Sequence, residues 1–128
     1  MDVPFYARLA GNAGLAALCG DRIYPEAAPA ETASPFIVWQ RISGVPEPGA
    51  LDAENDITTA RVQVDSYATT ALAARTLANA VRAALRDWKA SDGEIRNVEF
   101  SNDRAIREDD PALKMSRVAQ EYEVTFVE

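Results

Sequence analysis

The stretch Ile-Thr-Thr-Ala-Arg-Val-Gln-Val-Asp-Ser-Tyr, residues 57–67, decides the fold of this chain. Apolar and polar residues alternate along it with a period of two, which is typical of a β-strand with one buried face. The residues expected on the core side are Ala60, Val62 and Val64, and those expected on the other side are Arg61, Gln63 and Asp65. Such a half-buried strand indicates an antiparallel sheet whose covered face packs against another layer.

A helix is expected directly after this strand. Thr69 or Thr70 provides its N-cap, because a threonine hydroxyl accepts a hydrogen bond from the first turn of a helix. An apolar stripe at the spacing i, i+4, i+8 and i+11 then continues to about Trp88. The stripe consists of Leu77, Val81, Leu85 and Trp88, while Arg75, Asn79, Arg82 and Arg86 occupy the solvent side. The pattern predicts a helical layer on one face of the sheet.

A second strand is expected before the first, at residues 36–43 (Phe-Ile-Val-Trp-Gln-Arg-Ile-Ser). The start of this strand is apolar on both faces, so we expect the domain core on one side and another contact on the other. The two faces carry Phe36 and Val38 on one side and Ile37 and Trp39 on the other. Residues 44–56 follow as a long acidic loop, and the two strands make an antiparallel hairpin.

Short helices are expected at the start of the chain, over residues 3–10 and 13–18. Asn12 is the expected N-cap of the second helix, and Gly20 is its expected stop. An extended piece at residues 22–24 and a proline-rich connector at residues 25–35 lead to the first hairpin.

The last two strands are expected at residues 94–100 and 118–127, with residues 101–117 joining them. The order is therefore helix, hairpin, helix, hairpin. This order predicts one α+β domain over residues 1–128, with a four-stranded antiparallel sheet built from two hairpins and helices packed on one face.

Composition excludes several classes of function. The 128 residues include 13 Lys and Arg, 20 Asp and Glu, and no His, so the net charge is 13 − 20 = −7. Without histidine, Ser-His-Asp and Cys-His catalysis are impossible, and the single Cys19 cannot form a disulfide within the chain. The acidic balance argues against a protein that binds nucleic acid by neutralising phosphates. No membrane span and no signal peptide are expected.

No motif in the chain supports a catalytic, cofactor or metal site. The acids at positions 52, 54 and 56 resemble the start of a calcium loop, but Ile57 and Gln63 stand where that loop needs Gly and Glu. Lys114 and Ser116 could share one face of a strand, yet nothing marks an oxyanion hole beside them. We therefore expect no enzymatic activity, no cofactor and no metal.

Five segments, taken in order, resemble the tail completion family (head–tail joining or tail terminator proteins) of long-tailed phages, prophages and gene transfer agents. They are Leu-Cys-Gly-Asp-Arg-Ile-Tyr-Pro at 18–25, Ser-Pro-Phe-Ile-Val-Trp at 34–39, Arg-Val-Gln-Val-Asp-Ser-Tyr-Ala at 61–68, the helix at 77–85, and Tyr-Glu-Val-Thr-Phe at 122–126. Gly11 and Gly14 depart from the fuller helical pattern that the family keeps there.

The resemblance implies a structural protein without catalytic residues that forms a ring of identical subunits, commonly six. Such a ring lies at the virion neck, on the tail tube and facing the head connector or stopper protein, and is assembled in the bacterial host cytoplasm. DNA passes through it without specific binding, and no membrane is involved. The alternative is a small cellular ligand-binding or regulatory α+β domain, which needs a concave apolar pocket with converging polar groups.

A ring contact is heterologous, so each subunit presents different patches to its two neighbours. We expect sheet edges to pair or pack across subunits. The acidic loop either faces the channel, where it repels phosphate, or docks on the tail or head. The residues expected at a subunit or partner interface are Ile37, Trp39, Arg41, Val45, Pro46, Glu47, Pro48, Leu51, Asp52, Glu54 and Asp56.

Overall fold

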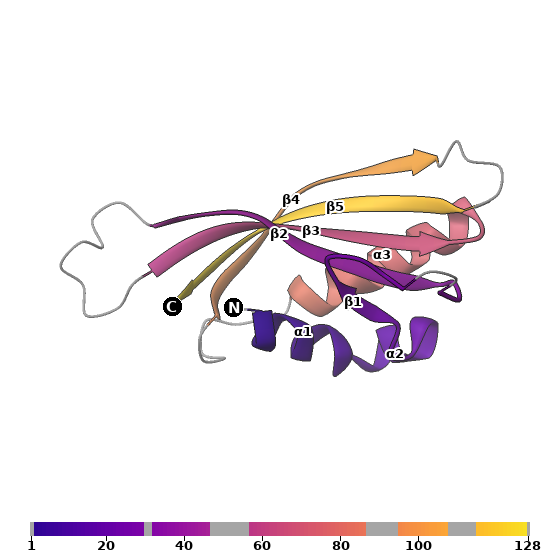
Figure 1. Cartoon of the computed structure of the whole chain (residues 1–128), viewed down its shortest axis with the longest axis horizontal. Helices are drawn as coiled ribbons and strands as arrows, with labels where there is room; N and C mark the ends of the chain where they lie inside the picture. Colours follow the sequence, from indigo (N-terminus) through magenta and orange to yellow (C-terminus); the bar gives the residue numbers. More distant parts are fainter. Residues whose placement is uncertain (1, 30–31, 47–56, 87–94, 108–114, 128) are drawn as a thin grey trace.

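The computed structural model describes residues 2–29, 32–46, 57–86, 95–107 and 115–127 (Figure 1). The element order is helix, helix, strand, hairpin, helix, hairpin. The elements are α1 (Asp2–Ala10), α2 (Ala13–Cys19), β1 (Ile23–Pro25), β2 (Phe36–Pro46), β3 (Ile57–Ala68), α3 (Ala71–Arg86), β4 (Ile95–Arg107) and β5 (Ser116–Val127). None of the helices in these ranges is long and apolar enough to cross a membrane.

The sheet has five strands in the order β1-β2-β3-β5-β4. The hairpins β2–β3 and β4–β5 meet through the antiparallel pair β3–β5, and β1 adds to β2 in parallel. The α+β class is confirmed, but the prediction of four antiparallel strands is wrong. The extended piece after Arg22 joins the sheet because its backbone bonds β2 at both ends, with Ile37 N donating to Arg22 O and Glu26 N donating to Trp39 O.

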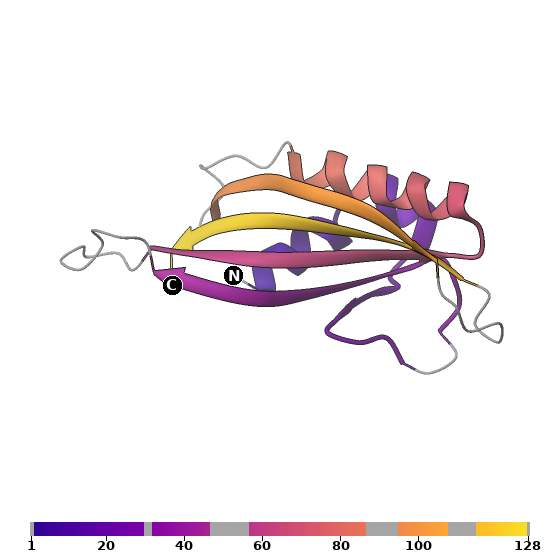
Figure 2. The same ribbon diagram turned by 90° about the horizontal axis from the view of Figure 1, so that it is seen from above.

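Strand β3 has the two faces that its alternation predicts. Ala60, Val62 and Val64 are buried in the main core, on the side that the helices cover. All three helices lie on this side of the sheet (Figures 1 and 2). We call the side that points away from the helices the open face.

The helix ends follow the predicted caps. Thr70 Oγ1 accepts a hydrogen bond from Ala73 N at 3.1 Å, and Asn12 Oδ1 accepts one from Leu15 N at 3.0 Å. Gly20 ends α2 with a φ of +61°, in the left-handed region that favours glycine. The predicted contribution of Trp88 to the α3 stripe lies outside the described residues.

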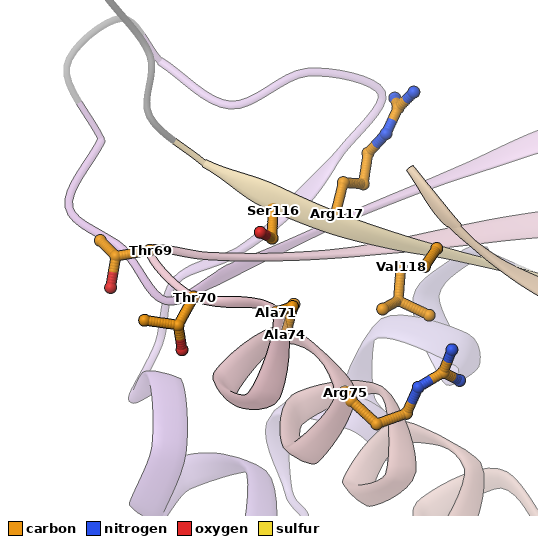
Figure 3. A pocket seen from close by; sticks show the side chains of 9 residues that line it. Thr69, Thr70, Ala71, Ala74, Arg75, Ser116, Arg117 and Val118 are labelled. Atoms are coloured by element: carbon orange, nitrogen blue, oxygen red, sulfur yellow. The ribbon is translucent and has the colours of Figure 1, made fainter. Parts of the chain in front are cut away.

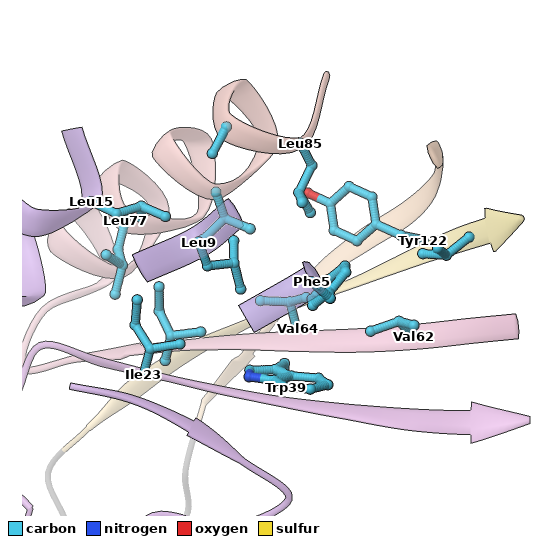
Figure 4. Close-up of a cluster of buried hydrophobic side chains, with 14 of the residues drawn as sticks. Phe5, Leu9, Leu15, Ile23, Trp39, Val62, Val64, Leu77, Leu85 and Tyr122 are labelled. Carbon is cyan, nitrogen blue, oxygen red and sulfur yellow. The ribbon is translucent and has the colours of Figure 1, made fainter. Parts of the chain in front are cut away.

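The core lies between the helices and the sheet (Figure 4). Leu77, Val81 and Leu85 of α3 are buried there together with residues of α1, α2 and the strands. The Phe5 ring of α1 packs on the Trp39 ring of β2 with 5.2 Å between centroids. Arg8 Nε donates to Ala84 O at 2.9 Å, which fastens α1 to α3.

Strand β4 differs most from its predicted extent. It runs over Ile95–Arg107, whereas residues 101–107 were expected to belong to a connection. The register against β5 shifts between Ile95 and Asn97 and again between Phe100 and Asn102, so Ser101 forms a bulge. After the bulge, each side chain lies on the opposite face from the one that regular alternation predicts. The sequence beyond Phe100 therefore does not show the period of two that indicates a strand.

Candidate assembly surface

The open face carries a polar cluster across β3 and β5. Gln63 Nε2 donates to both carboxylate oxygens of Asp65, at 2.9 and 3.0 Å. Arg117 Nη1 lies 3.8 Å from Asp65 Oδ2 and donates to the Tyr67 hydroxyl at 3.2 Å. Asp65 is only 4% exposed, so its charge needs these partners. The cluster holds β3 and β5 together within one chain.

A second group of charges lies on the open face beside β4. Glu99 of β4 is directly opposite Glu123 of β5, and Glu123 in turn is opposite Arg61 of β3. Like charges directly opposite each other destabilise a sheet. Asn97 Nδ2 donates to Glu99 Oε1 at 3.2 Å, which relieves part of this repulsion.

On the β1 side of the sheet, the chain's own hydrogen bonds close β1, which covers residues 37–39 of β2, whereas residues 40–46 of β2 have no neighbour on that side among the described strands. Ile23 N donates to Asp21 O at 2.8 Å, and the Pro25 carbonyl accepts from Ala27 N at 2.7 Å. Pro25 has no N–H to offer. Because β1 has only three residues, little of its backbone is left to pair with another strand.

The β4 edge is open by comparison. Strand β4 has 13 residues, and among the described strands only β5 pairs with it. Its residues 97–105 are exposed or half-buried. An edge of this length presents a row of backbone groups to which another strand can pair.

The predicted contact residues fall into three groups. Ile37 and Trp39 lie in the core, 0% and 4% exposed, so a partner cannot reach them without rearrangement of the helices. Arg41 is exposed, and its guanidinium carbon lies 5.1 Å from the Phe126 ring centroid. Val45 and Pro46 belong to the end of β2, opposite Thr59 and Thr58. The remaining predicted residues, Glu47, Pro48, Leu51, Asp52, Glu54 and Asp56, lie outside the described residues.

The contact on the second face of β2 comes from the same chain. Phe36 and Val38 are buried as well, and the Phe36 ring stacks on Tyr67 with 4.7 Å between centroids. The expectation that both faces of this strand are covered is confirmed. The burial of Phe36 therefore needs no second subunit.

A groove of about 550 Å³ lies between the start of α3 and the start of β5 (Figure 3). Small residues form much of its wall, among them Ala71, Ala74 and Val118. The Arg117 side chain extends away from α3, as Figure 3 shows, and Arg75 Nη1 is 2.9 Å from Asp103 Oδ2. A small-ligand site requires polar groups that converge, and the two arginine groups beside this groove do not.

Burial favours the protonated forms of Cys19 and Tyr122. Burial raises the pKa of the Cys19 thiol above its ordinary value, which disfavours the nucleophilic thiolate. Burial also raises the pKa of the Tyr122 hydroxyl far above its ordinary value, so the hydroxyl stays protonated and donates to Gln120 Oε1 at 3.1 Å. Within the described ranges, no group of three or more His, Cys, Asp or Glu side chains could hold a metal ion.

Sequence reasoning missed the exposed charges of the β4 edge beyond Phe100, namely Asp103 and Arg104. The predicted strand ended at Phe100 because alternation fails at the bulge. One signal could have extended it: residues 95–107 contain neither Gly nor Pro, the residues that most often end a strand.

Comparisons with known proteins agree over nearly the whole chain. A family model described as "Tail completion protein gp17" matches residues 3–126. Among solved structures, the chain is similar to one in a structure described as "Virion of native gene transfer agent (GTA) particle", with a TM-score of 0.72 and 22% identity. That match covers 97% of this chain and 92% of the other, and at this identity it shows a shared fold. No curated protein matches the chain.

Proposed function

Because the chain belongs to the tail completion protein gp17 family, we propose that it forms a ring at the head–tail junction that completes or terminates the tail tube and lets DNA pass. The family gives the chain a structural role in a phage-like tail. We further propose that the ring has six subunits and lies at the neck. Its proposed partners are the tail tube protein and the head connector or stopper protein.

The observation that carries the proposal is the extent of the family match. Residues 3–126 include every element from α1 to β5, so the resemblance concerns a whole domain rather than a short motif. The similar fold of a chain from a gene transfer agent virion supports the same role. Function in such a domain depends on which surfaces meet other proteins, and no chemical step is proposed.

We place the contact with the other tail components at the end of the sheet where β2 and β3 are joined. There β2 and β3 extend past the helices (Figure 1). The joining residues carry Glu47, Asp52, Glu54 and Asp56 and no base. With a chain net charge of −7, such a segment repels DNA phosphates and is complementary to a basic patch on the tail tube protein, which favours docking over DNA binding.

Electron microscopy of assembled tails tests the proposal. We expect the purified chain, mixed with the tail tube protein from the same gene cluster, to form rings at the ends of tubes and to fix tube length. A variant with the four acids replaced by Asn or Gln should fold normally and lose this attachment. As a matched control, replacement of Glu121, Glu123 and Glu99 by Gln removes acids from the open face and should leave attachment intact.

Two results would overturn the proposal. One is that tubes form with the same ends and lengths whether or not the chain is present. The other is that particles from a strain that lacks the gene have normal necks and inject DNA normally. Isolation of the chain as a monomer would not count against it, because a ring of this kind can form only on its template.

A further inference from the structure

The two edge strands of the sheet, β1 and β4, differ in how much backbone they leave unpaired. Backbone hydrogen bonds within the chain close the β1 edge, through Asp21 and Ala27. The 13 residues of β4 have one described neighbour, β5. We propose that β4 is where two copies of this chain pair, antiparallel, across a two-fold axis between Ser101 and Asn102. The pairing is independent of the ring and extends one sheet through both copies.

The shape of β4 favours a copy of itself as the partner. The strand has register shifts near Arg96 and at Ser101, and bulges of this kind bend a strand and increase its twist. A flat strand from another protein does not follow such a bend. A second β4 that runs antiparallel across the proposed axis has its bulge at the same place, with Ser101 of each copy opposite Asn102 of the other.

The charges on the open face match in this register. Glu99 of one copy lies opposite Arg104 of the second copy, and the symmetry repeats the pair, so each dimer gains two cross-strand pairs of opposite charge. The pairing with β5 places Glu99 opposite Glu123 and Arg104 opposite Ala119, so both side chains lie on the open face. A register centred on Glu99 or on Asp103 would instead place like charges opposite each other.

The helix-facing side matches in the same register. Phe100 of one copy lies opposite Asp103 of the second copy. The Arg82 guanidinium carbon lies 4.0 Å from the Phe100 ring centroid, which brings its charge beside that carboxylate. Asp103 is already 2.9 Å from Arg75 of its own chain, so each dimer would hold this carboxylate between two arginines. Between positions 99 and 104, both faces of the joined strands therefore gain opposite charges.

Backbone direction is also consistent with this register. Residues whose side chains lie on one face of the sheet direct their N–H and C=O groups toward the same neighbouring strand. Every charged pair described above joins two residues of the same face. In each pair, the backbone groups of both residues therefore point away from β5 or both point toward it. An antiparallel ladder between the two copies requires this match.

Charge reversal tests the register. We expect the wild-type chain to show a monomer–dimer equilibrium in analytical ultracentrifugation. Glu99→Arg alone or Arg104→Glu alone should weaken dimerisation about ten- to hundred-fold, because each places two like-charged pairs in the dimer. The double variant Glu99→Arg with Arg104→Glu should restore it. Glu121→Arg is the matched control, since Glu121 lies on the same face but on β5, and it should leave dimerisation unchanged.

Cysteine cross-linking provides a second measurement. Glu99→Cys and Arg104→Cys variants, mixed and oxidised, should form a disulfide-linked dimer, because the two positions are directly opposite across the axis. Glu99→Cys alone should not, since two copies of position 99 lie five residues apart along the paired strands, about 17 Å. Cys19 is buried and does not compete.

Three results would overturn the inference: a wild-type chain that stays monomeric up to its solubility limit, a double variant as weak as the single ones, or cross-linking of Glu99→Cys with itself. Each of these results would leave the proposed function standing, because the pairing is independent of the ring. Dimers that show the cross-link, together with tails indifferent to the chain, would overturn the proposed function alone.

Discussion

The two edges of the sheet solve the problem of unpaired backbone in opposite ways. The β1 edge is short, contains a proline and uses its own neighbouring residues, so that Asp21 and Ala27 take the hydrogen bonds that another strand could have made. The β4 edge is long, bulged and charged. Closure by local hydrogen bonds leaves β1 little backbone for assembly, whereas bulges and charges leave β4 as an edge that favours a matching strand.

We expect the largest difference between the two edges in their contribution to the free energy of unfolding. Ile23 of β1 is 3% exposed and packs in the main core. Ile23→Ala should lower the free energy of unfolding by about 2–5 kcal/mol, since it removes buried methyl groups and leaves a cavity. Urea unfolding followed by circular dichroism measures this loss.

Val98→Ala is the matched control on the β4 edge. Val98 is half-buried and borders the core, so its truncation should lower the free energy of unfolding by less than about 1.5 kcal/mol. Equal losses of unfolding free energy in Ile23→Ala and Val98→Ala would contradict the distinction between a buried edge strand and an accessible one.

Tyr122, which lies on β5 next to the β4 edge, should make the stability of the fold depend on pH in the alkaline range. Tyr122 of β5 packs edge-on against Phe100 of β4, with 5.6 Å between centroids. Burial raises the pKa of its hydroxyl above the ordinary value of 10.0. The unfolded chain therefore loses this proton first, and stability is full below about pH 10 and falls above it, by up to about 1.4 kcal/mol per pH unit.

The variant Tyr122→Phe isolates this effect. It should be about 1 kcal/mol less stable at neutral pH, because Gln120 Oε1 loses its donor. Its stability should nevertheless fall less steeply than that of the wild type above pH 10 in urea titrations. Parallel slopes for the two proteins would show that Tyr122 is not the titrating group.

The closed edge also depends on the turn that precedes it. Gly20 has a φ of +61°, and a Cβ there would have open space, since the nearest heavy atom would be Arg22 Nη1 at 3.9 Å. Gly20→Ala should therefore lower the free energy of unfolding by about 1–2 kcal/mol through backbone strain alone. Thermal unfolding measures it. Gly20→Asn should lose about as much, since asparagine is favoured in the left-handed helical region and the ψ of −129° at Gly20 lies outside it. A larger loss for Asn would point to crowding instead.

The smallest expected effect is at the open edge. Glu99→Gln removes the like-charge contact with Glu123 and should raise the stability of the monomer by about 0.2–0.5 kcal/mol at low salt. The gain should shrink as salt screens the charges. In Glu121→Gln, the altered side chain is opposite Gln63 and Asn102, so no comparable gain is expected. Equal gains for both would indicate an effect of net charge.

Strong local patterns were predictable from sequence. The alternation at Ala60, Val62 and Val64, the stripe of α3 and the caps at Asn12 and Thr70 all appear as expected. Each of these depends on neighbours within one element. The parallel addition of β1 depends on backbone bonds to β2, a partner more than ten residues away, and no periodicity reports such bonds.

Prediction of the contact surface was harder for a physical reason. Trp39 and Ile37 were assigned to an interface because β2 is apolar on both faces, but the stacking of Phe36 on Tyr67 supplies the second contact within the chain. Conversely, the sequence places Arg104 in a connection because the bulge at Ser101 interrupts alternation. A residue's accessibility depends on the whole sheet, which single-strand patterns do not describe.

Closure of the β1 edge by Asp21 and Ala27 sets a limit on growth. A protein with two available edges can add molecule after molecule and build a fibre. Here β1 leaves little backbone for another strand, so the proposed pairing through β4 would join two molecules and would not be repeated through β1 into an amyloid-like polymer.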